Sequence, residues 1–287
     1  MNYIFYYKGT INSHIYESLN SVLSNDEEAR IFFCSDQKIF SKSERFNLIN
    51  LNEINSDLID EIDKLEKFEK LDNNPLWKTS LMRVFYIYEL AQNLKLNSFV
   101  HFDSDVLIYK PYEELIDNFS QSKVNITQLS KDMLIFGYCY VANLDNYKKV
   151  CESIIEIYEK KSYYESTYYD GKSLVEMRSL YLSYLLNPDL FNILPSLPTK
   201  NENILFDPLS YGQYLGGRHY KKFSKGYLDR EHLTYDLMKS KKVVPKYKKG
   251  KSYIIHNNKN IDLANLHIHS KNLSKYRPKS YNNYFYL

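Results

Sequence analysis

The sequence predicts an α/β fold in which helices flank a mixed, mainly parallel sheet, followed by an irregular C-terminal extension. Short β-rich runs alternate with longer amphipathic segments over roughly the first hundred residues, an order typical of parallel strands connected by helices. The strand-like runs end in polar or glycine-containing turns. Hydrophobic residues make up 44% of the chain and charged residues 25%, a composition that supports a folded core.

The elements of the N-terminal part follow from their periodicity. The strand-like segments are residues 2–7, 29–34 and 98–102. Apolar residues at helical spacing cover residues 11–23, 52–71 and 76–94. Because ligands bind beyond the carboxyl ends of parallel strands, we expect three turns to share one rim of the sheet: Lys8–Thr10, Ser35–Asp36 and Asp103–Asp105.

The second half of the chain is less regular. Strands are predicted at residues 133–141 and 191–194, and helices at residues 146–160 and 173–186. Three of the 8 glycines fall within residues 212–217, which predicts a loop whose backbone approaches something closely. No internal repeat or linker is evident, so we expect residues 1–287 to form a single domain.

Composition excludes several classes of protein. A formal net charge of +3 gives no reason to expect a nucleic-acid partner. The three cysteines are far apart and in apolar settings, which indicates buried thiols in a reducing compartment and not a disulfide or zinc framework. Neither a signal peptide nor an apolar run of the roughly eighteen residues that span a bilayer is evident, so the protein is expected in the cytoplasm or peripherally on the cytoplasmic membrane face.

Two carboxylates, Asp103 and Asp105, follow the strand at residues 98–102 with one serine between them. At this spacing both can coordinate one divalent cation through their carboxylate oxygens. Such a cation neutralises the charge that develops on a diphosphate leaving group. The alternative is a polar turn that ends a strand.

The context of this turn resembles GT-A glycosyltransferases, in which a helix with a basic residue and a hydrophobic strand precede a DxD motif. The resemblance covers residues 1–145 and implies a Rossmann-like sheet that binds a nucleotide-sugar donor, UDP-linked, with Mn²⁺ or Mg²⁺. The resemblance implies that Asp103 and Asp105 bind the metal ion and that Ser104, between them, contacts the nucleotide-sugar donor. Arg83 is expected at the donor sugar or diphosphate, although a solvated helix charge is an equal alternative. Residues 146–287 would form the acceptor side and a C-terminal metal- and phosphate-binding segment.

The same resemblance places residues beside the nucleotide. Tyr7 and Asp36 are expected to border the base and ribose, where a carboxylate accepts hydrogen bonds from base N–H or ribose hydroxyl groups. For Asp36 an ordinary loop aspartate is equally plausible.

Two histidines near the C-terminus alternate with apolar residues, so in a strand His267 and His269 share one face. The segment from His269 resembles the HxxGxxKPW segment of glycogenin-like retaining enzymes, with the same His-to-Lys spacing. It implies His269 as third metal ligand, with His267 in reserve, and Lys275 at the diphosphate. Tyr-Arg-Pro stands where that family has Pro-Trp, so Lys271 is the alternative phosphate ligand and retention or inversion stays open.

Two acids are candidates for the general base of an inverting transferase. Asp207 precedes the glycine cluster, and Glu176 opens the amphipathic segment at residues 176–180 within the helix predicted at residues 173–186. For Glu176 the alternative is a helix N-terminal acid favoured by the macrodipole.

The stretch Lys239–Lys251 carries seven lysines, which is consistent with a solvated loop or with attraction to anionic lipid headgroups. The region around the histidines also resembles transferases of bacterial surface-polysaccharide loci and large viruses, which implies a glycan or glycolipid acceptor in surface polysaccharide or lipopolysaccharide synthesis. Alternatives are a sugar nucleotidyltransferase, disfavoured by the sparse Lys8–Thr10 turn, and a catalytically silent glycan- or nucleotide-binding module.

Overall fold

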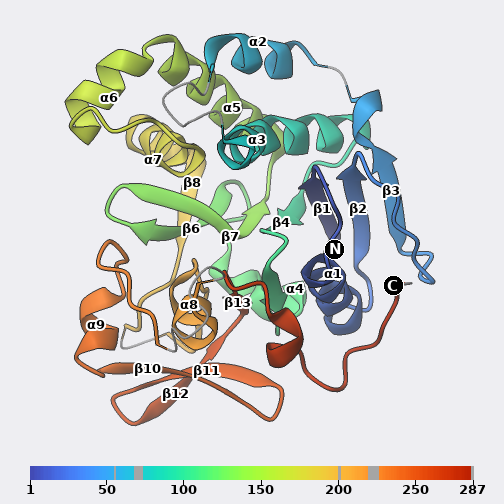
Figure 1. Ribbon diagram of the computed structural model, residues 1–287, viewed down its shortest axis with the longest axis vertical. Coiled ribbons are helices and arrows are strands. Elements are labelled where there is room, and N and C mark those ends of the chain that lie inside the picture. The colour runs from blue at the N-terminus through green and yellow to red at the C-terminus, as the bar shows by residue number, and fades with distance from the viewer. Residues whose placement is uncertain (55, 68–73, 200–201, 219–225, 286–287) are drawn as a thin grey trace.

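The computed structural model describes residues 1–54, 56–67, 74–199, 202–218 and 226–285. A seven-stranded sheet with the order β3-β2-β1-β4-β7-β6-β8 forms its centre (Figure 1). The strands of this sheet are β1 (Asn2–Tyr7), β2 (Arg30–Ser35), β3 (Phe46–Asn50), β4 (Phe99–His101), β6 (Val124–Ser130), β7 (Met133–Val141) and β8 (Phe191–Leu194).

The sheet is mixed and mainly parallel, as the sequence predicts. Strands β3, β2, β1 and β4 are parallel, β7 is antiparallel to both β4 and β6, and β8 is parallel to β6. The turns after β1, β2 and β4 therefore lie at one edge. The Gly9 backbone N–H donates to Asp36 Oδ1 at 2.9 Å, which ties the first two of these turns together.

Helices cover both faces of the sheet. The described α-helices are α1 (Ser13–Asn25), α2 (Asp57–Leu65), α3 (Pro75–Asn93), α4 (Tyr112–Leu115), α5 (Leu144–Glu159), α6 (Lys161–Tyr169), α7 (Glu176–Leu186), α8 (Ser210–Gly216) and α9 (Tyr235–Lys239). Figure 1 shows α2, α3, α5 and α7 grouped on one side and α1 on the other.

Alternation along β1 explains these two layers, because successive side chains of a strand point to opposite faces. Ile4 and Tyr6 belong to the apolar core under α2, α3, α5 and α7, whereas Tyr3 and Phe5 pack in the core that contains α1.

Two predicted helices differ from the sequence analysis. The helix expected over residues 52–71 is shorter: a 3₁₀ turn at Leu51–Glu53 precedes α2, and residues 55 and 68–71 lie outside the described part of the chain. The helix expected over residues 173–186 begins later, at Glu176.

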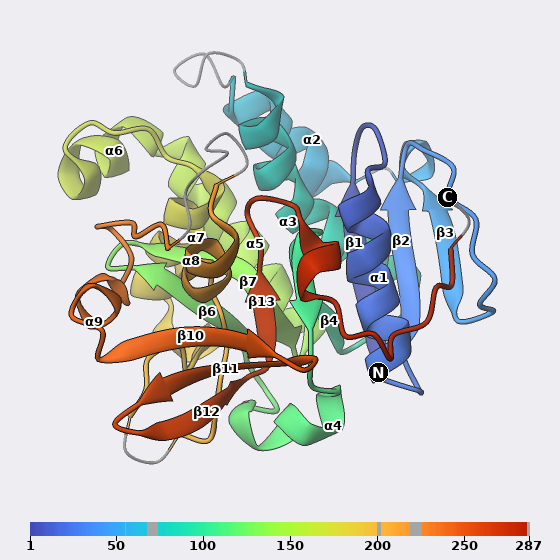
Figure 2. The ribbon, with the colours of Figure 1, turned by 60° about the horizontal axis from the view of Figure 1, so that its bottom comes forward.

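The C-terminal part is more regular than predicted. It contributes β10 (Val243–Lys248), β11 (Lys251–His256) and β12 (Lys259–Leu263) to a four-stranded sheet completed by β9 (Ile204–Leu205). A further pair joins β13 (Asn265–His267) to β5 (Val106–Ile108). Strands β10–β12 lie on the opposite side of the molecule from α2 (Figures 1 and 2).

The lysine-rich stretch Lys239–Lys251 is not a loop, because most of it forms the antiparallel β10–β11 pair. Its turn is built by Lys249 and Gly250, both with positive φ. Contact of this stretch with a membrane stays a prediction. In the described part of the chain, no helix has the length and apolarity required to cross a bilayer.

Candidate active site

The turn that carries Asp103 and Asp105 is fixed at both ends by backbone hydrogen bonds. The Asp103 N–H donates to the Phe136 carbonyl of β7 at 2.8 Å, and the Val106 N–H donates to the Asp103 carbonyl at 3.1 Å. Asp105 is 7% exposed. The two carboxylates are thus held at the carboxyl end of β4, where the sequence predicts a ligand site.

Strand β13 brings a histidine to these carboxylates. It pairs antiparallel with β5, with His267 opposite Val106, and the Ile268 N–H donates to the Asp105 carbonyl at 2.8 Å. His267 Nε2 lies 3.0 Å from Asp105 Oδ1 and 3.5 Å from Asp103 Oδ2.

One ligand atom from each of Asp103, Asp105 and His267 lies within 4.8 Å of the others, so these side chains form a group that can hold a metal ion. The structure therefore favours His267 over His269, which the resemblance placed first. β13 ends at His267, so the strand alternation that put both rings on one face does not continue to His269. His269 still lines the same cavity.

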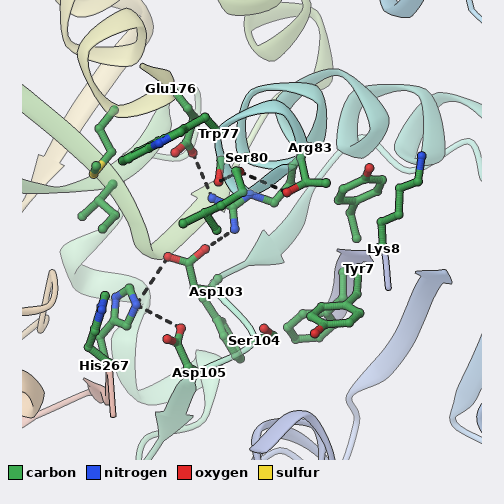
Figure 3. Close-up of a pocket in the computed structure, with 18 of the residues that line it drawn as sticks. Tyr7, Lys8, Trp77, Ser80, Arg83, Asp103, Ser104, Asp105, Glu176 and His267 are labelled. Atoms are coloured by element: carbon green, nitrogen blue, oxygen red, sulfur yellow. Dashed lines mark hydrogen bonds and ion pairs between the residues drawn. The ribbon is translucent and has the colours of Figure 1, made fainter. Parts of the chain in front are cut away.

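Two basic side chains contact the carboxylates. Arg83 reaches from α3, with Nη1 bonded to Asp103 Oδ1 and Nη2 donating to Glu176 Oε1 at 2.9 Å. Lys271 Nζ donates to Asp105 Oδ2 at 3.0 Å. Figure 3 shows Arg83 between Asp103 and Glu176, and His267 facing both aspartates.

The position of Arg83 follows from the way α3 starts. The Asn74 side chain accepts from the Leu76 N–H at 3.0 Å, and Pro75 occupies the first turn, where a missing N–H costs no hydrogen bond. The guanidinium of Arg83 also lies 5.1 Å from the centre of the Phe136 ring. Arg83 is therefore an ordered group of the site and not a solvated helix charge.

The proximity of these charges shifts their pKa values. Burial would raise the pKa of Asp105, but the cationic His267 and Lys271 hold it well below its usual value. Burial would lower the pKa of His267, but the carboxylates of Asp105 and Asp103 raise it to about 9. Burial raises the pKa of Glu176 to about 7 even though Arg83 opposes the shift. Glu176 can thus exchange a proton near neutral pH.

These side chains line a cavity of about 560 Å³. Tyr7, Lys8 and Ser104 line it on the side of β1, and Trp77 lines it from α3 (Figure 3). Among the predicted donor-binding residues, Tyr7, Arg83, Ser104 and Lys271 are thus brought together. Trp77 belongs to the apolar helical pattern predicted over residues 76–94, and nothing in that pattern predicts its place at the cavity.

Two predicted donor-binding residues lie apart from this cavity lining. Asp36 accepts from the Gly9 N–H and is not among the residues that line the cavity. Lys275 lines a second cavity, with Tyr214, Tyr247 and Tyr276. Of the two phosphate candidates, Lys271 is the one at the carboxylates.

Asp207 needs correction as a candidate base. It is 0% exposed, and its carboxylate accepts backbone hydrogen bonds from Leu209 and Tyr211 on Oδ1 and from Gly212 and His267 on Oδ2. A carboxylate with both oxygens occupied inside the protein is a structural acceptor and has no access to an acceptor hydroxyl.

The glycine cluster permits close packing of the backbone next to Asp207. A Cβ at Gly212 would lie 2.3 Å from the His267 carbonyl oxygen, so only glycine permits this close approach. The close approach predicted for the cluster is therefore to the backbone of β13. Asn265, which the sequence analysis did not single out, completes the support: its amide donates to the Gly137 and Asp207 carbonyls and accepts from the Asp207 N–H.

No family model matches this chain, and no curated protein matches it. One similar solved structure is the apo-form glycosyltransferase GlyE of Streptococcus pneumoniae TIGR4, with 11% identity and a TM-score of 0.43 over 75% of this chain and 48% of that one. Another is the galactosyltransferase LgtC with donor and acceptor sugar analogues, with 13% identity and a TM-score of 0.40 over 68% of this chain and 73% of that one. A third is mouse xyloside xylosyltransferase 1, with 13% identity and a TM-score of 0.40 over 69% of this chain and 89% of that one.

The chain spans about half the length of the GlyE structure that it matches. These solved structures are glycosyltransferases, as the sequence resemblance predicts. With identities of 11–13% and TM-scores below 0.5, donor, acceptor and reaction have to follow from the chemistry of the site.

Proposed function

We propose that this protein is a metal-dependent glycosyltransferase. It moves a sugar from a nucleoside diphosphate donor, a UDP-sugar, to a hydroxyl group of a glycan acceptor. The observation that carries the proposal is the group formed by Asp103, Asp105 and His267, which lies in a cavity at the carboxyl edge of a mainly parallel sheet.

The donor set fits a divalent cation. Two carboxylates and one imidazole suit Mn²⁺, which accepts both oxygen and nitrogen ligands, and they leave coordination positions for diphosphate oxygens. Asp105 is 7% exposed and His267 is 4% exposed, so both ligands are held by the surrounding fold. When bound, the cation supplies the positive charge that a departing diphosphate requires.

The remaining side chains have separate tasks. Lys271, with its Nζ at Asp105, is placed to bind a diphosphate oxygen next to the metal ligands. Arg83 orients the Asp103 and Glu176 carboxylates and presents its guanidinium to the donor sugar. Glu176, with a pKa raised to about 7 by burial, accepts the proton of the attacking hydroxyl. We extend the proposal to an acceptor of surface polysaccharide or lipopolysaccharide synthesis on the sequence resemblance alone.

The test is donor hydrolysis and transfer with a panel of UDP-, GDP- and ADP-linked sugars, with Mn²⁺ and with excess chelator. Asp105→Asn should abolish both activities because it removes the negative charge and replaces one of the two carboxylate oxygens by an amide NH₂, which cannot coordinate a cation. The matched control is Asp189→Asn, the same substitution at an exposed position outside the cavity.

Activity that persists in chelator or in Asp105→Asn would refute the metal site. Mn²⁺-dependent binding without any turnover would indicate a silent nucleotide-binding module instead. Pyrophosphate release from a nucleoside triphosphate and a sugar phosphate would identify a nucleotidyltransferase.

A further inference from the structure

Part of the cavity is lined by uncharged and partly apolar side chains, which binding of a metal ion and a diphosphate does not require. The metal-binding group and Lys271 lie together, and Tyr7 and Lys8 line the side toward β1. The first two turns of α3 contribute Leu76, Trp77 and Ser80 to the lining, and α7 contributes Met177. In Figure 3, Trp77 and Tyr7 lie on opposite sides of the Arg83–Asp103 pair.

We propose that this part of the cavity, defined by Leu76, Trp77, Ser80 and Met177, binds the sugar acceptor, and that the Trp77 indole is the platform for the C–H face of its ring. The proposal rests on the proposed function and specifies its substrate as a neutral glycan. We refer to these four residues as the acceptor end.

Apolar surface is left open at the acceptor end. Leu76 is 59% exposed although it lines the cavity. Trp77 is partly buried: it packs against the core under α3 and lines the cavity as well. An indole anchored on the core presents a rigid flat face, so little conformational entropy is lost when a ring packs on it. Exposed apolar groups in a concave site are typical of ligand contacts.

The chemistry of the acceptor end favours a neutral sugar. The first two turns of α3 contribute only uncharged side chains to the described cavity lining: Pro75, Leu76, Trp77, Thr79 and Ser80. One face of a pyranose ring is made of C–H groups, whose partial positive charge is attracted by the negative face of an aromatic ring. The Thr79 and Ser80 hydroxyls donate to backbone carbonyls of α3, and their oxygens can accept hydrogen bonds from the hydroxyl groups at the rim of such a ring.

Glu176 links the acceptor end to the reaction. It lines the same cavity and is held by Arg83, whose other nitrogen contacts the metal-site carboxylate Asp103. Figure 3 shows Glu176 on the side of Trp77 and away from Tyr7. A sugar on Trp77 therefore presents its hydroxyl to the carboxylate that takes the proton, while the donor lies toward Asp103. The bond formed joins the acceptor oxygen to the donor sugar, and the nucleoside diphosphate leaves.

The sequence contains a single tryptophan, so its fluorescence reports on Trp77 alone. Protein loaded with Mn²⁺ and UDP is titrated with lactose, maltose, cellobiose and N-acetyllactosamine while tryptophan is excited selectively. A saturable change is expected with at least one of these sugars. For the sugar that accepts transfer, Trp77→Ala should raise the acceptor KM about 10-fold or more, the scale of a lost aromatic contact. Trp77→Phe should retain most of the affinity, and UDP affinity by calorimetry should change less than two-fold in both variants.

The matched control is Tyr163→Ala, an aromatic truncation at a position on α6 that is 58% exposed and outside the cavity. It should leave acceptor KM and UDP affinity unchanged. If Trp77→Ala does not fold, Trp77→Phe and Leu76→Ser carry the kinetic test. No fluorescence response to any sugar, or an unchanged KM in the Trp77 variants, overturns the acceptor platform while Mn²⁺-dependent donor hydrolysis still supports the glycosyltransferase. Absence of Mn²⁺-dependent UDP binding in the wild type overturns both.

Discussion

Replacement of Asp207 by asparagine should destabilise the fold and leave the chemistry of the folded fraction within a few-fold of the wild type. The carboxylate accepts four backbone hydrogen bonds, from Leu209 and Tyr211 on one oxygen and from Gly212 and His267 on the other. Asparagine has one acceptor oxygen, so two of these buried N–H groups lose their partner. At about 1.5–3 kcal/mol for each bond to a charged group, the free energy of unfolding should fall by about 3–6 kcal/mol.

Urea denaturation measures this change directly, and thermal unfolding should show a fall in Tm of about 6 °C or more. The comparison is Glu176→Gln, which keeps an oxygen to accept from Arg83 Nη2 but cannot accept a proton. Glu176→Gln should lower kcat by about 10²-fold or more with little change in stability or donor affinity.

A different pair of results would refute this reasoning. If Asp207→Asn kept its stability and lost about 10²-fold in kcat, Asp207 would be the base and its backbone hydrogen bonds would be of minor energetic weight. If neither variant lost activity, transfer would proceed without a carboxylate base.

Three further outcomes follow from the same geometry. His267→Ala should weaken Mn²⁺ binding in calorimetry by about 10-fold or more, and His269→Ala should weaken it less; equal losses would contradict the assignment. Lys271→Ala should raise the Kd for UDP with Mn²⁺ by about 10-fold, because a charge-assisted bond is lost, whereas Lys275→Ala, at a separate cavity, should not. Burial lowers the pKa of His232 from 6.5 to about 4, so its neutral form stabilises the fold above pH 6.5 and this stability is lost as the pH falls toward 4. Between pH 7 and pH 5, the free energy of unfolding of the wild type, measured by urea denaturation, should therefore fall by up to about 2 kcal/mol more than that of His232→Asn. Parallel pH profiles of the two proteins would count against this role.

Strand and helix periodicity was sufficient to predict the part of the fold that positions the carboxylates. The β4 strand is followed by Asp103, and the mainly parallel order puts the turns after β1, β2 and β4 at one edge. These features are local or follow from a rule about parallel strands, so the sequence contains them.

The partners of the carboxylates were harder to predict because they depend on where a strand stops. The alternation around His267 and His269 gives no sign that β13 ends at His267. Asp207 was a candidate base because it precedes a glycine cluster, and only the fold shows that its carboxylate accepts four backbone hydrogen bonds. Contacts between residues so distant in sequence leave no periodic pattern.

The group formed by Asp103, Asp105 and His267 joins the first half of the chain to its last segment, and this has a consequence during synthesis. Lys271 and Asp105, which bond to each other, are separated by 166 residues. At about 5–20 residues per second, the ribosome makes the second residue roughly 10–30 s after the first. For that interval the nascent chain has the carboxylate turn without its histidine and lysine. The candidate site is therefore complete only in the final stage of translation, and a product truncated before His267 lacks one of its three candidate metal ligands.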